Sequence, residues 1–367
     1  ETYLAMGKII KTIALFLFII TGQITLGQTN QEKAHEKGEK AVQLEDEGKF
    51  DEAIKLLEDA QKLDPNEIGY PYEIGYSYYS KEDYKKAAKY LEKILNDPKT
   101  DEHVFQLLGN CYDLMGKTEK ALETYDAGLK KFPQSGRLFL EKGNVYFTQK
   151  DYNKAISFYE QGIKSDPQFP SNYYRATQIY CSSTEEVWGM IYGEIFMNLE
   201  RNSERTSEIS KLLYNTYKSE IKFINDTSFS VSFSKNSSMN IEDSKNPSKN
   251  KLPFGIGIYE PTLILAMINE KGIDINSLDR IRNKFVVEYF KNENNKKYPN
   301  ILFDYQNQIL KAGHLEAYNH WILMKGDEDG FNKWYIENTV KWENFINWFT
   351  DNGLKIDNSN KFFSGQY

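Results

Sequence analysis

The chain has 367 residues, with 46 lysine and arginine residues against 53 aspartate and glutamate residues, and its formal net charge is −7. This acidic balance argues against nucleic-acid binding, which rewards basic stripes that neutralise phosphates. The length exceeds what one compact core usually holds, so we expect two structural regions. Only Cys111 and Cys181 are present, and we expect two unpaired thiols rather than a disulfide framework.

The first predicted element is a signal peptide over residues 6–27. Lys8 and Lys11 give it a basic start, Ile13–Ile20 is an apolar run, and small residues precede its end. The run is too short to span a bilayer, which needs roughly 20 apolar residues, so we expect cleavage rather than stable membrane insertion. An uncleaved amphipathic anchor is the alternative. The predicted location is therefore periplasmic or secreted.

A repeat with a period near 34 residues follows the predicted signal. Its clearest marks are prolines at intervals of 33, 35 and 34 residues, each closing one unit of the same pattern; they are Pro65, Pro98, Pro133 and Pro167. Proline ends a unit because it lacks an amide donor and restricts the residue before it. Self-similarity at this period indicates a solenoid whose units bury their hydrophobic faces against their neighbours.

Small residues recur inside each unit where two helices are expected to touch. Gly75, Gly109 and Gly143 stand in the first helices, and alanines recur in the second helices at positions 53, 87, 121 and 155. Such residues let two helix backbones approach closely. The turn between the helices carries Gly48 or Gly116, or a polar pair in the other units.

This pattern resembles the tetratricopeptide repeat over about residues 34–168. The resemblance implies a mostly α fold, a superhelical solenoid of antiparallel helix pairs with a concave groove. We place the solenoid at residues 34–183, with four repeats and a partial fifth, because no proline closes the fifth unit and residues 185–188 depart from its pattern.

The resemblance also implies which side chains line the groove. They are first-helix residues one helical turn apart on the inner face, where Asn110 and Asn144 occupy equivalent places. A carboxamide at that place can donate to and accept from a peptide backbone. The full predicted partner-binding set is Tyr72, Tyr76, Tyr79, Gln106, Asn110, Asp113, Arg137, Leu140, Asn144, Phe147, Tyr174 and Gln178. The alternative is that the tyrosines pack against the C-terminal half of the chain and close the groove.

Residues 184–352 lack the repeat and predict a mostly helical C-terminal domain, similar to the extensions of exported bacterial tetratricopeptide-repeat proteins. Phe229, Val231 and Phe233 alternate with serines and predict a strand, which Phe254–Ile258 is expected to join as a short β-hairpin. Residues 234–251 between them are polar and predict a mobile loop. Residues 353–367 form a tail.

Two features of the later helices are also predicted. Asn276 or Ser277 is expected to cap a helix that carries Leu278 and Ile281 on one face. The last helix is expected to bear a dense run of aromatic residues, namely Phe331, Trp334, Tyr335, Trp342, Phe345 and Phe349.

Catalytic and metal-binding patterns are weak. His314 and His320 are six residues apart, which does not place them on one helical face as metal ligands at i and i+4 would be. Residues 325–336 lack acidic residues at the first and last ligand positions of a calcium loop. We therefore expect no catalytic residue, no metal and no cofactor.

The sequence thus predicts an exported protein-interaction scaffold that binds a peptide or partner helix in its groove, and not an enzyme. Two alternatives stay open. One is a hydrolase or metal-dependent activity in the C-terminal domain. The other is a non-catalytic pocket for a peptide or glycan between the domains.

Overall fold

The computed structural model describes residues 29–225, 228–235 and 253–367. The chain divides into two compact units, Glu1–Phe132 (unit 1) and Pro133–Tyr367 (unit 2). This division falls inside the predicted repeat array, so the compact units and the repeats are different partitions of the chain. The predicted signal peptide 6–27 lies outside the described residues, as does the predicted loop 234–251 apart from its first two residues.

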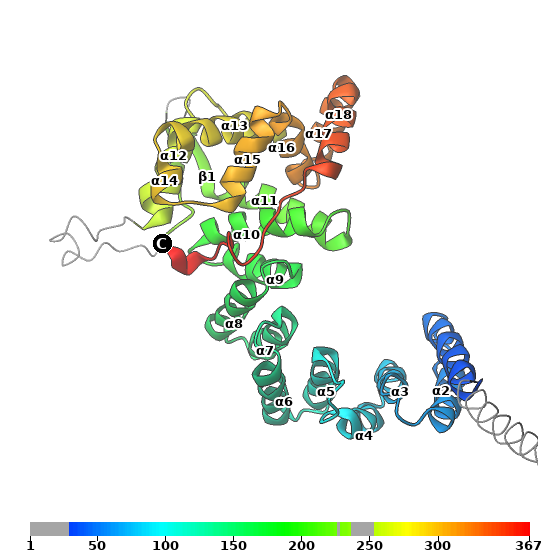
Figure 1. The fold of residues 1–367 in the computed structure, drawn as a ribbon. Coiled ribbons are helices and arrows are strands. Elements are labelled where there is room, and N and C mark those ends of the chain that lie inside the picture. Colours follow the sequence, from blue (N-terminus) through cyan, green and yellow to red (C-terminus); the bar gives the residue numbers. More distant parts are fainter. Residues whose placement is uncertain (1–28, 226–227, 236–252) are drawn as a thin grey trace, which may run out of the picture. The chain divides into compact units, whose positions relative to one another are not determined.

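Unit 1, in its described part, consists of antiparallel helix pairs, drawn from blue to cyan in Figure 1. They are a helix over residues 29–46 with α2 (Phe50–Leu63), α3 (Gly69–Ser80) with α4 (Tyr84–Ile94), and α5 (Glu102–Leu114) with α6 (Thr118–Lys131). Ala53, Ala87 and Ala121 are fully buried in the second helices. The predicted small-residue contacts therefore form the core of each pair.

The turns inside the pairs share one hydrogen-bonding scheme. Gly116 has a left-handed φ of 72°, its N–H donates to Asp113 O at 2.8 Å, and Lys117 N donates to Tyr112 O at 2.8 Å. This is a Schellman motif, which satisfies the last carbonyl groups of the first helix. The same pair of bonds recurs around Gly48, Glu82 and Lys150, so these positions are structurally equivalent.

Unit 2 begins with two further pairs, α7 (Gly136–Thr148) with α8 (Tyr152–Ser165), and α9 (Pro170–Tyr180) with α10 (Glu186–Leu199). Helix α10 packs along α9 as α8 packs along α7. The fifth pair therefore has both of its helices. The departure from the pattern at residues 185–188 changes which residues α10 buries, and nearly all of its length is enclosed.

The rest of unit 2 is mostly helical, as predicted. Its elements are α11 (Glu204–Glu220), β1 (Ile221–Asn225), β2 (Ser228–Val231), the π-helix η2 (Gly255–Tyr259), α12 (Glu260–Ala266), α13 (Ile275–Lys291), α14 (Asn294–Lys297), α15 (Ile301–Lys311), α16 (Leu315–Leu323), α17 (Glu328–Glu337), α18 (Thr339–Asp351) and the 3₁₀ turn η3 (Ser364–Gln366). Aromatic side chains dominate its core, including Phe254, Tyr289 and Tyr318.

The hairpin exists, but its predicted pairing was wrong. Strand β2 pairs antiparallel with β1, with Ile221 opposite Val231. The segment 254–258 instead forms η2, and the Phe254 ring lies in the aromatic core. Ile221 continues the apolar spacing of α11, so the sequence gives no separate sign of β1. The nearer segment in sequence pairs more readily because a shorter loop must close.

Two helix boundaries also differ from the prediction. Asp274 rather than Asn276 or Ser277 caps α13, since its side chain accepts a hydrogen bond from Ser277 N at 2.7 Å and Ser277 Oγ accepts one from Asp274 N. Ser277 therefore completes a capping box as its third residue. The predicted last helix is two helices, α17 and α18, separated at Asn338.

Candidate functional site

The contact between the helices of a pair is closest at the repeated glycines. A Cβ atom on Gly109 of α5 would stand 2.1 Å from Tyr125 Cε1 of α6. A Cβ atom on Gly143 of α7 would stand 2.2 Å from Tyr159 Cε1 of α8. Only glycine admits these rings so close to the backbone. The two tyrosines therefore fill the space behind the first helices.

An asparagine follows each of these glycines and joins the two helices. Asn110 Oδ1 accepts a hydrogen bond from Tyr125 OH at 2.5 Å, and Asn144 Oδ1 accepts one from Tyr159 OH at 3.0 Å. The sequence predicted that both carboxamides contact a partner. The structure uses one acceptor site of each within the fold, which gives these residues a structural role.

The other predicted contact residues of unit 1 lie on α3 and α5, which contact each other. Tyr76 is 42% exposed, whereas Tyr72, Tyr79, Gln106 and Asp113 are half-buried. The Tyr79 ring packs edge-on against Tyr84, with centroids 5.5 Å apart. Among the predicted tyrosines, Tyr76 thus presents the largest exposed fraction.

In unit 2, the predicted residues of α7 are half-buried; they are Arg137, Leu140, Asn144 and Phe147. The Phe147 ring packs edge-on against Tyr152 at 5.5 Å, and the Arg175 guanidinium lies 5.6 Å from the Phe147 ring centre. Gln178 of α9 accepts a hydrogen bond from Arg175 at 3.1 Å. Phe147 of α7 and Arg175 of α9 therefore form a mixed aromatic and cationic contact.

Tyr174 of α9 is held by the chain itself. Its side chain is 9% exposed, its hydroxyl donates to Glu208 Oε2 of α11 at 2.5 Å, and the Arg205 guanidinium lies 5.0 Å from its ring centre. Helix α11 thus covers this position, as the alternative reading of the tyrosines anticipated for the C-terminal half. Contacts within the chain therefore occupy both the ring and the hydroxyl of Tyr174.

Two surface hollows of about 490 and 520 Å³ lie between successive first helices of unit 1. Glu67 and Glu73 line both of them, Glu39 and Asp64 line the first, and Tyr72 lines the second. Burial, with a smaller contribution from the nearby Glu45 carboxylate, raises the pKa of Glu73 to about 7. The ionisable residues that line the first hollow are therefore mainly acidic, whereas Lys99 and His103 also line the second. Glu73 changes charge near neutral pH.

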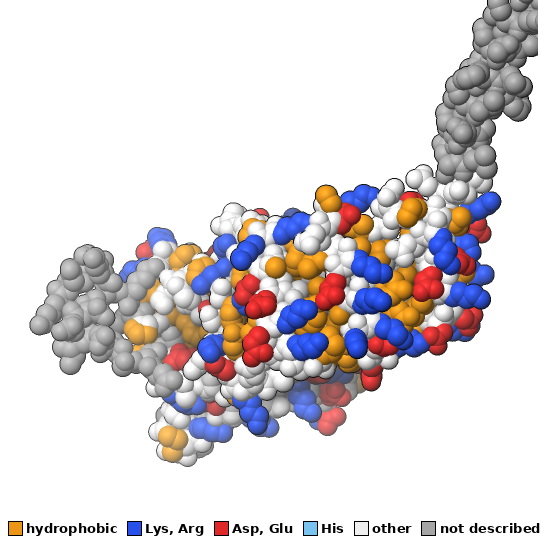
Figure 2. Space-filling view, turned by 90° about the horizontal axis from the view of Figure 1, so that it is seen from below, with side chains coloured by type: hydrophobic (Ala, Val, Ile, Leu, Met, Phe, Trp, Pro, Cys, Tyr) orange, Lys and Arg blue, Asp and Glu red, His pale blue; other side chains and the backbone are white. Residues whose placement is uncertain are grey.

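Charges of both signs are mixed elsewhere on the surface. Figure 2 shows blue and red side chains interleaved around hydrophobic ones on one face. Such mixing forms no single-sign field on that face.

Residues 44–111 match the tetratricopeptide-repeat family. The chain therefore contains tetratricopeptide repeats. Residues 80–162 also match the family described as anaphase-promoting complex, cyclosome, subunit 3. Tetratricopeptide repeats form extended binding surfaces, so the coarse prediction of a protein-interaction scaffold agrees with the family. Comparison with curated proteins gives no match.

Several solved structures are similar to this chain. The thermophilic TPR protein TTC0263 of Thermus thermophilus is 17% identical, with 49% of this chain and 98% of that chain covered and a TM-score of 0.42. PilF of Pseudomonas aeruginosa is 16% identical, with coverages of 52% and 86% and a TM-score of 0.44. YrrB, described as a TPR protein with an unusual peptide-binding site, is 18% identical, with coverages of 48% and 92% and a TM-score of 0.34.

The histidines of the C-terminal region have structural surroundings. His320 is buried, its ring stacks on Trp334 at 4.0 Å, and its Nδ1 lies 2.8 Å from Glu316 O. Burial lowers its pKa. His314 packs against Trp348 at 5.4 Å. Within the described residues, no group of three or more histidine, cysteine or acidic side chains is placed to hold a metal ion.

The cysteines and the helices add two further observations. Both cysteines are free thiols, with Cys111 buried, and burial raises the pKa of both to about 12. In the part of the chain that is described, every helix is too short or too polar to traverse a lipid bilayer.

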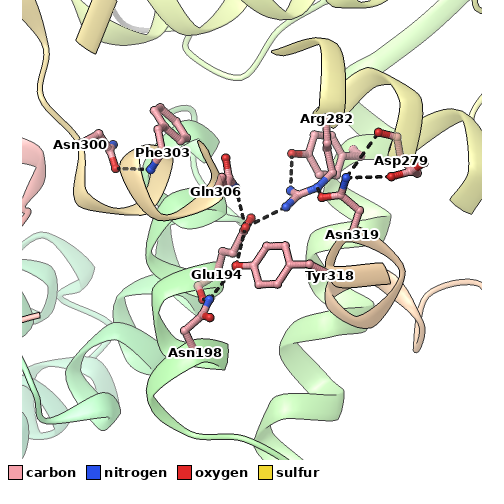
Figure 3. Close-up of polar contacts among 10 residues, drawn as sticks. Glu194, Asn198, Asp279, Arg282, Asn300, Phe303, Gln306, Tyr318 and Asn319 are labelled. Carbon is pink, nitrogen blue, oxygen red and sulfur yellow. Dashed lines mark hydrogen bonds and ion pairs between the residues drawn. The ribbon is translucent and has the colours of Figure 1, made fainter. Parts of the chain in front are cut away.

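A buried ionic network in unit 2 was missed by the sequence reading (Figure 3). Arg282 of α13 donates to Glu194 Oε1 of α10 at 2.8 Å, and the two side chains are 7% and 3% exposed. Tyr318 OH and Gln306 Nε2 donate to the same oxygen at 2.9 and 2.5 Å. One carboxylate oxygen therefore connects α10, α13, α15 and α16.

The surroundings of Arg282 explain why it stays charged. Burial alone would lower its pKa, but the neighbouring Glu194 carboxylate outweighs this, and the pKa is raised. Its other nitrogens donate to Asn319 Oδ1 at 2.8 Å and to Tyr217 OH at 3.2 Å. Beside the pair lies a cavity of about 20 Å³, room for about one water molecule. The geometry therefore indicates a structural centre.

One sequence signal could have pointed to this network. Glu194 is the only charged residue between Val187 and Leu199, in a helix that is otherwise nearly all apolar. An acid in such a run is expected to be buried, and a buried acid needs a partner. The partner itself is 88 residues away in sequence, so its identity carried no local signal.

Proposed function

We propose that this chain, which contains tetratricopeptide repeats, is an exported interaction scaffold, periplasmic or secreted, which binds an extended peptide or a partner helix through the first helices α3 and α5 of unit 1. Export rests on the composition of residues 6–27 alone. Binding rests on the family and on one observation. The predicted tyrosine of α3, Tyr76, is 42% exposed, although neighbouring tyrosines are packed.

An exposed tyrosine suits a binding role. It offers a rigid apolar ring with a polar tip, so that it can contact a partner at a low cost in side-chain entropy. The glycine contact behind α5 holds this helix rigidly against α6. A rigid support reduces the ordering cost of binding.

The charged residues that line the hollows indicate which kind of partner segment would fit there. Glu39, Asp64, Glu67 and Glu73 line the space between successive first helices of unit 1. A lysine or arginine side chain in such a space would pair with carboxylates, whereas an acidic segment would be repelled. The partner segment that fits the first hollow therefore carries a basic residue.

In-cell photo-crosslinking tests the proposal. A photoreactive residue is placed at Tyr76, and the matched control is Lys89 on α4, which is exposed on a second helix. We expect the Tyr76 position to yield a crosslinked protein that the Lys89 position does not, identified by mass spectrometry. Equal crosslinking at the two positions would contradict binding through the first helices.

Asn110→Ala and Asn144→Ala are less suitable tests. Each change would leave a partly buried tyrosine hydroxyl without its acceptor, at a cost of about 1 to 3 kcal/mol. If the double variant no longer binds a partner, the loss could therefore arise from lower stability as well as from a missing contact. We expect a lower melting temperature in each single variant, measured by circular dichroism, whereas an unchanged melt would restore them as candidate contact residues.

A further inference from the structure

The residues after α18 form an extended segment that lies against the second helices of unit 2. Figure 1 shows this red segment leaving α18 and running past α10 to the end marked C. Residues 353–357 and 361–363 have no helical or strand structure. Contacts with other elements therefore fix the segment, rather than regular backbone hydrogen bonding of its own.

Phe362 anchors the segment. It is 1% exposed, and its ring centre lies 6.1 Å from that of Trp188 and 6.2 Å from that of Tyr192, both on α10. Gln168 Nε2, before α9, donates to Ile356 O at 3.1 Å. An aromatic anchor in a well-packed socket is the usual centre of a peptide-binding site.

The residues on both sides of the anchor contact α8. Lys361 Nζ donates to Lys164 O at 2.6 Å, and Lys164 Nζ lies 4.3 Å from the ring centre of Phe363. Both contacts place α8 of the fourth pair beside residues on either side of Phe362. The socket is thus shared by two successive second helices.

A carboxylate of α8 completes the site. Glu160 Oε1 accepts hydrogen bonds from Tyr180 OH at 3.0 Å and from Tyr192 OH at 2.9 Å. The same oxygen accepts from Ser364 Oγ, and Ser364 N donates to Tyr192 OH at 2.7 Å. The two tyrosines hold the carboxylate in place for the serine, as a preorganised recognition site would.

We propose that the outer face formed by α8 and α10 is a second peptide-binding site, which recognises an extended Lys-Phe-Phe-Ser segment and is filled by residues 361–364 of the same chain. The occupant in trans is the corresponding segment of a second copy. The contacts of this site come from α8, α9 and α10 rather than from α3 and α5, so the inference does not depend on the proposed scaffold function.

The tether explains why the site is filled by its own chain. A short linker keeps a segment at an effective concentration in the millimolar range, which excludes a dilute competitor. The exposed turn at residues 357–360 precedes the anchor. Its Asn358 Oδ1 accepts a hydrogen bond from Lys361 Nζ at 3.2 Å, but the contacts of Lys361 and Ser364 with α8 come from residues after the turn. Cutting the chain there would remove the tether and leave the site intact.

The test inserts a specific protease site between Asn358 and Ser359 of the full chain. The probe is a fluorescent peptide of residues 359–367, followed by fluorescence anisotropy. After cleavage and removal of the released piece by dialysis, we expect the peptide to bind at least a hundredfold more tightly than to the uncut chain. The Phe362→Ala peptide should bind at least tenfold more weakly than the wild-type peptide.

A second variant keeps the inference testable if the cut protein unfolds. Phe362→Ala in the uncut chain weakens only its own segment, so the labelled wild-type peptide should bind it at least tenfold more tightly than the wild-type chain. Ile336→Ala, at a position 76% exposed on α17, is the matched control and should behave as wild type. If the peptide binds neither the cut chain nor the Phe362→Ala chain, the inference is wrong, and the segment is an integral part of the fold.

Discussion

Unit 1 and unit 2 are stabilised in different ways. The core of unit 1 repeats a few small contacts, such as Ala53, Ala87 and Ala121, each against its neighbouring helix. Unit 2 adds to its repeats an aromatic core and a buried ion pair, Glu194 with Arg282, that connect helices distant in sequence. A change in unit 1 should therefore act locally, whereas a change at the ion pair should affect several helices together.

Among these substitutions, Arg282→Met is expected to lower the free energy of unfolding the most. It would leave the Glu194 carboxylate buried without its ion-pair partner, at a cost of about 3 to 5 kcal/mol in the free energy of unfolding. All five tryptophans lie in unit 2, so urea unfolding followed by tryptophan fluorescence reports this loss. We expect the midpoint to fall while amide protection in unit 1 is unchanged.

Arg280→Met is the matched control, two residues away on the same helix. Arg280 pairs with Glu270 at 2.6 Å, but its side chain is 54% exposed, and Lys284 also contacts that carboxylate. Its loss should cost about 1 kcal/mol or less. Adding Glu194→Gln to Arg282→Met should recover part of the stability, since it removes the unpaired charge. Equal losses of stability in Arg282→Met and Arg280→Met would contradict the view that the buried ion pair stabilises unit 2 more than the exposed pair does.

Gly109→Leu should have a smaller and local effect. The added side chain would meet the Tyr125 ring, so α5 and α6 must separate, at a cost of about 1 to 3 kcal/mol. Hydrogen exchange should show faster opening of α5 and α6, with the tryptophan midpoint of unit 2 unchanged. Gly272→Leu, at a position with open space around it, is the control. Uniformly faster exchange throughout both units would contradict the local behaviour expected of unit 1.

The two units should also differ in their response to pH. Because the folded-state pKa of Glu73 is raised to about 7 from 4.5, folded unit 1 binds more protons than the unfolded chain between these values. The contribution of Glu73 to stability therefore falls as the pH rises through this window. In unit 2 the pKa of His320 is lowered from 6.5, so its contribution is lost as the pH falls below that value.

Glu73→Gln tests the unit 1 side of this contrast. At pH 8 it should stabilise α3 by roughly 1 to 3 kcal/mol relative to the wild type, and by much less at pH 5. Hydrogen exchange of the α3 amides measures the difference, with the exposed Glu123→Gln on α6 as control. The same gain at both pH values would mean that the ionised carboxylate is not the cause.

The repeats could be predicted from the sequence because their contacts recur at fixed offsets. Gly109 against Tyr125 and Gly143 against Tyr159 are one contact seen twice, and such repetition reveals spacing without coordinates. The inward hydrogen bonds of Asn110 and Asn144 could not be predicted, since a half-buried amide on a helix gives no sign of which neighbour it bonds.

For the C-terminal region, the sequence predicted the mostly helical fold class but not which elements contact one another. Helical periodicity predicted that the region is mostly helical and identified the helix with Leu278 and Ile281, but contacts that occur once carry no period. The pairing of β1 with β2 and the joining of Glu194 to Arg282 depend on which surfaces meet during folding, and local spacing does not encode that choice. For the same reason, the socket for Phe362 had no counterpart in the sequence reading.

The turns inside the helix pairs bear on how this protein could be engineered. The left-handed position carries Gly48 and Gly116 in two of the five pairs, but Glu82 and Lys150 in two others, with φ values of 60° and 62°. A side chain in that conformation costs roughly 1 kcal/mol that glycine avoids. Replacing these two residues by glycine would make the loops uniform and give a more heat-tolerant variant without altering any surface on which a partner depends.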